Sequence, residues 1–160
     1  MGNMNIEIER KFLVKNEAYK SEAIRVQTLT QGYLSTDPKR AVRIRICDEE
    51  AYITIKGETS KNGTSRFEWE KKIDIKEAEN LIVLCHKSII TKIRHHVPYG
   101  KHTFEVDEFL GDNTGLVVAE LELTDELESF ERPNWIGKEV TGIKKYYNSQ
   151  LSQNTFKNWE

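Results

Sequence analysis

The sequence predicts a mainly β fold of the α+β class, namely an eight-stranded antiparallel sheet or barrel with helices packed outside it. Apolar and polar residues alternate with a period of two in eight segments of the 160-residue chain, which is the pattern of strands with one buried face. The segments with this pattern are short and mostly joined by tight loops, as in meandering sheets and barrels. A chain of this length suits one hydrophobic core, so we expect a single domain over residues 1–160.

Eight segments carry the strand pattern. They span residues 4–14, 29–35, 40–47, 51–57, 66–73, 90–98, 101–109 and 116–124. Stretches rich in glycine and small polar residues at 57–65 and 111–115 indicate hairpin loops rather than linkers between domains. Helical spacing of apolar residues occurs in four further places, which we expect to cover the outside of the barrel. These places are residues 16–24, 75–86, 125–131 and 144–156.

The chain carries many charges of both signs, yet it is close to neutral. Charged residues make up 31% of the sequence, and 24 Lys and Arg oppose 26 Asp and Glu, a formal net charge of -2. Proteins that bind nucleic acid or acidic membranes are normally basic, so we expect neither partner. The N-terminus has no apolar signal segment and no run reaches membrane-spanning length, so we expect a cytoplasmic protein. The sequence does not say whether the chain is a monomer or a homodimer.

The familiar motifs for zinc and for nucleotide phosphates are absent from the sequence. Cys47 and Cys85 stand far apart, which indicates reduced thiols rather than a zinc cluster or a disulfide framework. His95 and His96 are adjacent, so on a strand they face opposite ways, and no zinc-binding spacing occurs. No glycine-rich phosphate loop is present either. Any chemistry must therefore come from the charged residues.

In the predicted strands, ionised residues occupy one face and apolar residues the other. Glu7, Glu9 and Lys11, for example, alternate with Ile6 and Ile8. Charges of the same sign recur two residues apart, so both members of each pair share a face. The acidic pairs are Glu7/Glu9, Glu68/Glu70, Glu105/Asp107 and Glu120/Glu122, and the basic pairs are Arg43/Arg45 and Lys92/Arg94.

A sheet with one solvated face alternates in the same way, and alternation alone favours that simpler interpretation. The polar faces, however, are nearly all ionised, with few of the Ser, Thr or Gln residues that usually cover a solvated strand. Carboxylates two residues apart lie roughly 6.7 Å from each other and repel by about 2.5 kcal/mol at an effective dielectric constant of ~20. In a confined interior, four such pairs cost on the order of 10 kcal/mol, comparable with the stability of a whole domain. We therefore expect cations beside the acidic pairs and an anion beside the basic pairs.

The chemistry of the charged groups indicates which ligands would fit. Barrels of about eight strands can enclose a lumen of ligand size. Carboxylates without a matching set of His or Cys residues favour Mg²⁺ or Mn²⁺. Arg and Lys opposite these carboxylates suit a polyanion such as phosphate. The residues thus predict a charged lumen that binds a phosphate compound together with a hard divalent cation.

Motifs follow one another in a fixed order along the chain. They are EIERK from Glu7 to Lys11, QGYL from Gln31 to Leu34, VRIRI from Val42 to Ile46, TIK from Thr54 to Lys56, FEWEKKI from Phe67 to Ile73, TKIR from Thr91 to Arg94, FEVDEF from Phe104 to Phe109, AELEL from Ala119 to Leu123 and EVTGIKKYYN from Glu139 to Asn148. This ordered set, which covers essentially the full length, resembles the CYTH or triphosphate tunnel metalloenzyme family. It is most similar to the short bacterial, tripolyphosphatase-like members.

The resemblance implies a closed eight-stranded antiparallel β-barrel, whose tunnel binds a triphosphate end to end. It implies phosphate contacts from Lys11, Arg43, Arg45, Lys56, Lys92, Arg94 and, near the last helix, Lys144. It implies that one or two divalent ions are held by Glu7, Glu9, Asp107, Glu120 and Glu122. It associates Tyr33 and Lys92 with hydrolysis, while a tyrosine that only packs the hairpin is the alternative for Tyr33. Ile143 stands where the family often has an acidic residue, which leaves the role of the C-terminal helix open.

The expected activity is metal-dependent hydrolysis of inorganic tripolyphosphate or of a small organic triphosphate such as thiamine triphosphate. One alternative in the same fold is a class IV adenylyl cyclase, which converts ATP to cyclic AMP and pyrophosphate and needs a purine pocket. The sequence shows no aromatic or amide cluster for such a pocket. A second alternative is a non-catalytic module that binds polyphosphate or nucleotide. A pure binder could dispense with the metal-side carboxylates, so the complete set of acidic pairs favours the enzyme.

Overall fold

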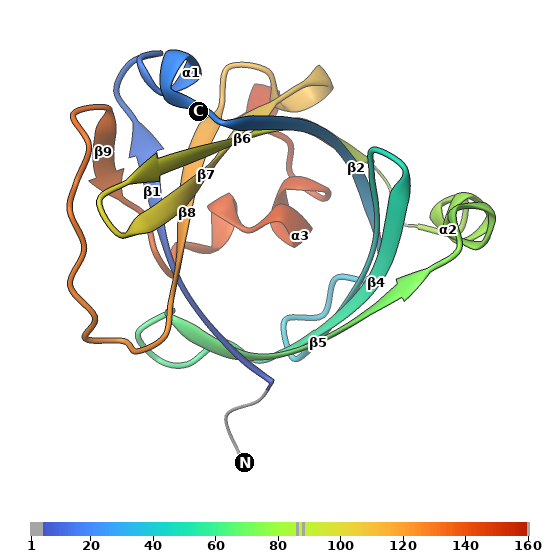
Figure 1. Cartoon of the computed structure of the whole chain (residues 1–160). Coiled ribbons are helices and arrows are strands. Elements are labelled where there is room, and N and C mark those ends of the chain that lie inside the picture. Colours follow the sequence, from blue (N-terminus) through green and yellow to red (C-terminus); the bar gives the residue numbers. More distant parts are fainter. Residues whose placement is uncertain (1–4, 86, 88, 160) are drawn as a thin grey trace.

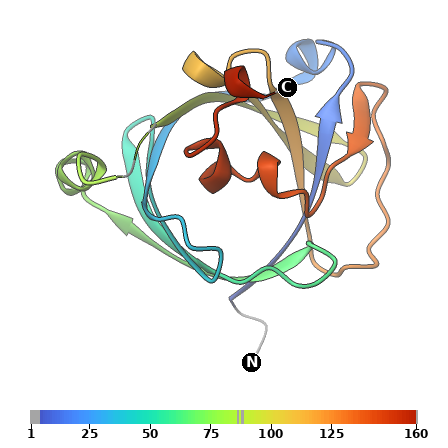
Figure 2. The same ribbon diagram turned by 180° about the vertical axis from the view of Figure 1, so that it is seen from behind.

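The computed structural model describes residues 5–85, 87 and 89–159. Eight antiparallel strands form a closed barrel (Figures 1 and 2). In chain order they are β1 (Ile6–Val14), β2 (Arg25–Ser35), β3 (Arg40–Cys47), β4 (Glu50–Gly57), β5 (Ser65–Ile73), β6 (Ile90–Tyr99), β7 (His102–Phe109) and β8 (Val117–Leu123). Their order around the wall is β5-β4-β3-β2-β6-β7-β8-β1, and pairing of β1 with β5 closes the ring. The predicted eight-stranded barrel is confirmed.

A ninth strand, β9 (Ile136–Glu139), pairs with the end of β1. β5 pairs with β1 only over residues 6–8, whereas Phe12 of β1 lies opposite Glu139 of β9. β9 therefore continues the wall along β1 where β5 no longer pairs with it. Four residues are too few to display a period of two, which is why the sequence pattern did not predict this strand.

The strand registers turn the ionised side chains into the barrel and the apolar ones outward. Residues directly opposite each other on antiparallel strands share a face of the sheet. Lys11 lies opposite Glu120, and Arg94 lies opposite Asp107. Phe12, the next residue after Lys11, belongs to the outer face and is fully buried under the elements that cover it. The two faces predicted from alternation are the two sides of the barrel wall.

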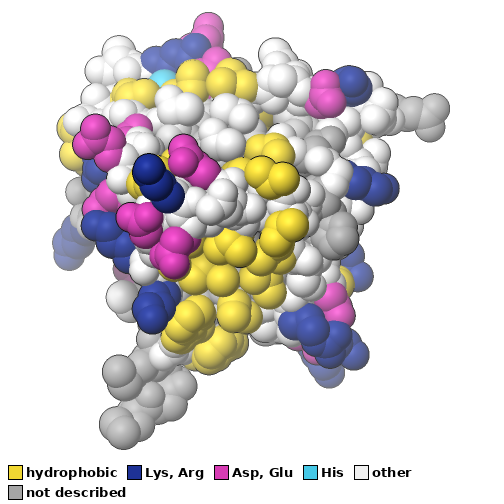
Figure 3. Space-filling view, turned by 90° about the vertical axis from the view of Figure 1, so that its right-hand side faces the viewer, with side chains coloured by type: hydrophobic (Ala, Val, Ile, Leu, Met, Phe, Trp, Pro, Cys, Tyr) yellow, Lys and Arg dark blue, Asp and Glu magenta, His cyan; other side chains and the backbone are white. Residues whose placement is uncertain are grey.

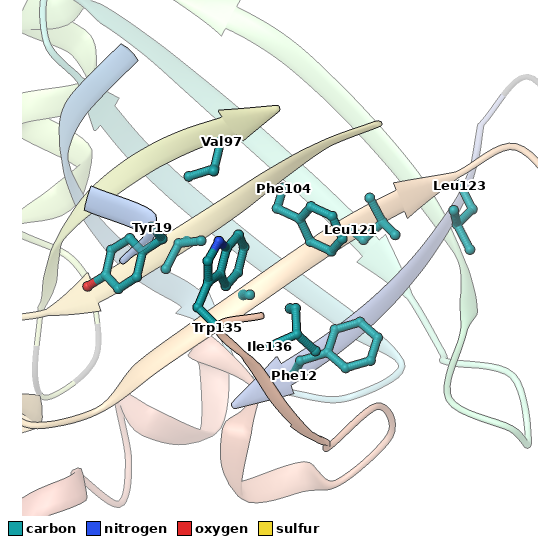
Figure 4. Close-up of a cluster of buried hydrophobic side chains, with 10 residues drawn as sticks. Phe12, Tyr19, Val97, Phe104, Leu121, Leu123, Trp135 and Ile136 are labelled. Atoms are coloured by element: carbon teal, nitrogen blue, oxygen red, sulfur yellow. The ribbon is translucent and has the colours of Figure 1, made fainter. Parts of the chain in front are cut away.

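The larger apolar core lies outside the barrel, over β1 and β6 to β8 (Figure 4). Trp135, in the segment before β9, is buried there, and its ring meets Phe104 edge-on with the ring centroids 5.5 Å apart. The short helix α1 (Tyr19–Glu22) contributes Tyr19, whose ring meets Trp135 at 6.0 Å. These aromatic contacts hold α1 and β9 against the outer wall.

The helix α2 (Ile75–Ile82) covers a second apolar core, outside β3 and β4. It begins with a capping box, in which the Asp74 side chain and the Glu77 side chain each accept a hydrogen bond from the other residue's backbone N–H. Ala78 packs against Ile44 and Ala51, and all three are fully buried. The predicted helix is confirmed in position, although it ends at Ile82 rather than at residue 86.

The helices leave part of the wall uncovered. Figure 3 shows apolar side chains gathered on the surface of the side that carries α2, between groups of charged residues. On β5, the outward-facing Phe67 and Trp69 are 46% and 38% exposed. The barrel is therefore covered more completely over β1 and β6 to β8 than over β5.

The C-terminal segment enters one end of the barrel. It contains the 3-10 turns η2 (Lys144–Tyr146) and η3 (Phe156–Asn158) and, between them, the short helix α3 (Asn148–Leu151). In both opposite views α3 lies within the ring of strands (Figures 1 and 2). Leu151 is fully buried in a cluster with Ile90 and Phe109, which lie on the inner faces of β6 and β7. We call residues 144–158 the C-terminal plug.

Two predicted helices differ from the structure. Residues 125–131 are irregular. The Glu128 carboxylate accepts a hydrogen bond from the Thr124 N–H at 2.7 Å and contacts His102 Nε2 at 2.6 Å. These contacts take the place of helical hydrogen bonds. Residues 144–156 form the broken plug instead of one helix. While α1 and α2 pack outside as predicted, α3 does not, because its apolar residue Leu151 finds an apolar ring inside the end of the barrel.

The remaining general expectations concern membranes and disulfides. Among the residues that the structure describes, no helix has both the length and the apolar character needed to span a bilayer. Cys47 and Cys85 are both free and partly buried, as predicted.

Candidate active site

The barrel encloses a polar cavity of about 240 Å³. Its lining includes every predicted site residue except Asp107 and Lys144. The predicted residues that line it are Glu7, Glu9, Lys11, Tyr33, Arg43, Arg45, Lys56, Lys92, Arg94, Glu120 and Glu122. Glu68, Glu70 and Glu105, which the resemblance did not assign, line the same cavity. The structure therefore brings together residues from all eight strands of the barrel.

Asp107 is not among the residues that line the cavity, and its carboxylate is paired with two cations. Its carboxylate accepts two hydrogen bonds from Arg94, at 2.8 and 2.9 Å, and forms an ion pair with Lys92 at 2.7 Å. Burial acts to raise the pKa of Asp107, but Arg94 and Lys92 outweigh it and hold the pKa well below its ordinary value. With its oxygens engaged in this way, Asp107 is better placed to hold the two cations than to bind a metal ion.

Lys144 does not reach the cavity. It begins the turn η2 and its side chain is exposed. The residues of the plug that line the cavity are instead Tyr147, Asn148 and Ser149. A prediction that treated 144–156 as one helix could not identify them, because the helix is broken at Tyr147. The motif that ends at Asn148 was the only sequence signal for this part of the site.

Lys92 is the most deeply buried cation of the site. Its side chain is 1% exposed, and Nζ contacts Asp107 Oδ2 at 2.7 Å and Asn148 Oδ1 at 2.8 Å. Burial lowers the pKa of Lys92 to about 7, although Asp107 acts in the opposite direction. Near neutral pH the amine is therefore present in both protonation states and can exchange a proton.

Tyr33 connects to Lys92 through two amide side chains. Its hydroxyl accepts a hydrogen bond from Gln31 Nε2 at 3.5 Å, and the same nitrogen donates to Asn148 Oδ1 at 3.0 Å. Asn148 Oδ1 is also the acceptor for Lys92. Tyr33 is 5% exposed and borders the cavity, so the structure places it beside the site and not only in a hairpin contact.

The cations of β4, β3 and β6 form what we call the basic wall, and their charges could be neutralised further by an anion. They are Lys56, Arg43, Arg45, Lys92 and Arg94. Burial lowers the pKa of Arg45 to about 10, and the nearby charges of Arg43 and Arg94 act in the same direction. Arg43 Nε is buried and has no hydrogen-bond partner within the described part of the chain. An anion that accepts from the accessible nitrogens of these guanidinium groups would relieve the repulsion between them.

The glutamates of β1, β5, β7 and β8 that line the cavity form what we call the carboxylate wall, and lysine and arginine neutralise it only in part. Glu120 contacts Lys11 at 3.6 Å and Arg94 at 3.3 Å; burial acts to raise its pKa, but these cations lower it to about 2. Glu9 behaves in the opposite way, because burial and the neighbouring carboxylates Glu120 and Glu7 raise its pKa well above the ordinary value. A further cation beside Glu9 would stabilise its charged form.

These carboxylates do not form a ready-made metal cage. Among the described residues, no three Asp, Glu, His or Cys side chains converge as a metal-binding group. Mg²⁺ does not require such a cage, since it retains several waters and commonly uses one or two carboxylates together with phosphate oxygens. The all-oxygen donor set of this wall fits a hard divalent ion that binds with its substrate.

The protein is thus a closed antiparallel β-barrel, whose polar cavity is lined by the basic wall and the carboxylate wall. The chain belongs to the CYTH domain family, whose model matches residues 5–154, and the resemblance is confirmed. It is 46% identical over 158 residues to the inorganic triphosphatase of Acetivibrio thermocellus, which spans 98% of this chain and 99% of that protein.

Solved structures have the same architecture. The crystal structure of the inorganic triphosphatase NE1496 is 33% identical, has a TM-score of 0.66, and covers 91% of this chain and 97% of that one. A conserved hypothetical protein from Pyrococcus furiosus, 22% identical with a TM-score of 0.61, covers 74% of this chain and 79% of that one. The second likeness concerns the fold alone.

The Asp107→Asn variant is expected to lose about 3–5 kcal/mol of unfolding free energy, because it removes the carboxylate that pairs with the buried Lys92 and Arg94. The lowered pKa of Asp107 sets the acid limb of the pH dependence: the contribution of the carboxylate is complete above its ordinary pKa of 3.8 and is lost as pH falls through the lowered, folded-state pKa. The difference from the unchanged protein should therefore be present at about pH 5 and shrink below about pH 4. Urea denaturation over this range measures it.

Glu108→Gln serves as the matched control. Glu108 is the next residue on β7, faces outward, and makes only long, partly exposed ion pairs, with Lys20 at 3.7 Å and His95 at 3.6 Å. We expect a loss of less than about 1 kcal/mol. Equal losses in the two variants would contradict the special position of Asp107.

Proposed function

We propose that this protein hydrolyses a linear triphosphate, inorganic tripolyphosphate or a small organic triphosphate, with Mg²⁺ or Mn²⁺ inside the barrel cavity. The observation that carries the proposal is the juxtaposition of a basic wall and an incompletely neutralised carboxylate wall around one cavity. The 46% identity to an inorganic triphosphatase over nearly the whole chain supports the same reaction.

The basic wall binds the phosphate chain in this proposal. Arg43 and Arg45 on β3 present guanidinium groups, which match phosphate oxygens in pairs. Lys56 on the adjacent strand β4, Arg94 on β6 and Lys11 on β1 add charge around the cavity. Several of these cations already contact carboxylates, so substrate phosphates and metal ions would exchange for those partners together and leave the cavity balanced.

The carboxylate wall holds the divalent ion. Glu7, Glu9, Glu120 and Glu122 are the proposed ligands, because they border the cavity and offer only oxygen donors. When bound, such an ion supplies Lewis-acid stabilisation of the charge on the phosphate oxygens. Asp107 has a different proposed role, since its ion pairs hold Lys92 and Arg94 in place.

The chain's own residues position the reactants and move one proton. Arg43 and Arg45 align the substrate so that water attacks the terminal phosphorus in line with the bridging oxygen. As the bond from the water oxygen forms, the bond to the bridging oxygen breaks, and orthophosphate and pyrophosphate result. Lys92, whose pKa is about 7, accepts the proton of the attacking water at Nζ when it is neutral. Tyr33 supports this amine through Gln31 and Asn148.

A substrate panel tests the proposal. Incubation with tripolyphosphate, thiamine triphosphate or ATP in Mg²⁺ or Mn²⁺ is expected to release orthophosphate, most efficiently from tripolyphosphate, because the cavity offers charges rather than base-reading groups. EDTA should abolish release, and rising ionic strength should raise KM. Chromatography identifies the products. Cyclic AMP as the main product from ATP would assign the cyclase reaction, and binding without turnover would assign a non-catalytic module.

The Lys92→Ala variant is expected to lower kcat for tripolyphosphate by about 10²–10⁴-fold, because it removes the proposed proton acceptor. Steady-state phosphate release measures this, and circular dichroism checks that the barrel is folded. Lys101→Ala is the control, since Lys101 is exposed in the turn between β6 and β7 and should keep the original kcat. A Lys92→Ala protein that retains full kcat would remove Lys92 from the chemistry.

The Glu9→Gln variant is expected to raise the Mg²⁺ concentration for half-maximal activity by about 10–100-fold, as the loss of a ligand weakens metal binding. The barrel should remain at least as stable, since a buried carboxylate beside Glu7 and Glu120 is neutralised. Activity titrations with Mg²⁺ and thermal unfolding measure the two effects. Glu49→Gln, in the exposed turn between β3 and β4, is the control. An unchanged Mg²⁺ requirement would place the ion elsewhere in the cavity.

A further inference from the structure

Two amide side chains join the C-terminal plug to the basic wall. Gln31, fully buried on β2, accepts a hydrogen bond from Arg45 Nε through Oε1 at 2.9 Å. Gln31 Nε2 donates to Asn148 Oδ1 at 3.0 Å, and Lys92 Nζ donates to the same oxygen at 2.8 Å. A chain of hydrogen bonds thus runs from Arg45 through both amides to Lys92, across 117 residues of sequence between Gln31 and Asn148.

The two cations determine how both amides are oriented. Guanidinium and ammonium groups donate hydrogen bonds and cannot accept them. Gln31 must therefore turn its oxygen toward Arg45, which directs its NH₂ group to Asn148. Asn148 turns its oxygen toward the NH₂ group of Gln31 in either protonation state of Lys92, and toward Lys92 when that group is NH₃⁺, because the reversed amide would set donors against donors. The orientation of Asn148 is fixed from two sides at once.

This orientation leaves the NH₂ group of Asn148 available. Both hydrogen bonds of its side chain within the described residues are made by Oδ1. Asn148 borders the cavity at the end that the plug closes, together with Tyr147 and Lys92. A phosphate oxygen can only accept hydrogen bonds, so an amide held with its nitrogen free is complementary to it.

We infer that Asn148 is a substrate-binding residue, whose Nδ2 donates to a phosphate oxygen of the triphosphate at the closed end of the cavity, while its Oδ1 positions Lys92. The inference rests on the proposed function and adds a neutral donor from the plug to the charged groups of the wall. The plug is then part of the binding site and not only its apolar closure. Lys92 and the substrate are aligned to each other through one side chain.

The Asn148→Asp variant separates the two roles. The carboxylate keeps an oxygen for Lys92 and for Gln31, but it replaces the donor with a negative charge that faces the phosphate. KM for tripolyphosphate is expected to rise about tenfold or more, since a hydrogen bond to a charged group is lost and a repulsion is added. kcat should change less when it is compared at alkaline pH, because Lys92 retains its acceptor, while the added carboxylate raises the pKa of Lys92 and shifts the pH profile of kcat upward. Asn148→Ala removes both contacts and should raise KM and lower kcat together.

The experiment compares Asn148→Asp, Asn148→Ala and the control Gln150→Glu by steady-state kinetics with tripolyphosphate. Gln150→Glu is the matched amide-to-acid change in the same helix, at a residue that does not line the cavity, and should keep both constants. Calorimetric binding of tripolyphosphate in EDTA, without turnover, is expected to be weakened in the Asn148 variants alone. If Asn148→Asp does not fold, Asn148→Ala carries the same test of KM and binding.

The outcomes distinguish this inference from the proposed function. Unchanged KM and unchanged calorimetric affinity in the Asn148 variants would overturn the inference, even if the protein hydrolyses tripolyphosphate. A fall in kcat alone, with KM unaltered in both variants, would also overturn the substrate contact and leave only the positioning of Lys92. If the unchanged protein hydrolyses no triphosphate, the proposed function fails, and the binding comparison still decides the role of Asn148.

Discussion

The balance of charge inside a closed wall is the constraint on which the structure depends. Like charges two residues apart on a strand would repel in the confined interior, and the antiparallel registers set opposite charges beside them, as with Lys11 and Glu120 or Arg94 and Asp107. A register shift of one residue would turn apolar side chains inward and charges into the outer core. The balance is incomplete at Glu9 and on the basic wall, where external ions would complete it.

The interior changes from ionised to apolar along the barrel, and the plug meets both regions. Leu151 completes the apolar cluster with Ile90 and Phe109, while Asn148, three residues earlier, bonds to Lys92. Ile90 and Lys92 are themselves two residues apart on the inner face of β6. Packing of the plug therefore also positions Asn148 beside Lys92, because a single helical turn carries both Leu151 and Asn148.

The fold and most of the site could be predicted because their signals are local. A strand displays its two faces every two residues, so eight strands and the ionised face of most of them followed from alternation, while the ordered motifs indicated the family and with it the closed tunnel. β9 was missed because four residues show no period. The helix predicted at 125–131 fails because Glu128 hydrogen-bonds with Thr124 and His102. Lys144 was expected at the cavity, but the broken plug leaves it exposed and presents Asn148 there instead.

By itself the sequence determined which residues share one face of each strand and which charges they bring, since both depend only on alternation along a strand. The tertiary structure alone decided which groups meet: Asp107 with Arg94 and Lys92, and Gln31 with Asn148. It also decided the pKa of Lys92, which burial lowers to about 7. Which side chains contact each other, and how deeply they are buried, depends on distances between residues remote in the chain. Those distances are set by the strand registers and by the position of the C-terminal plug, and both are fixed only when the barrel closes.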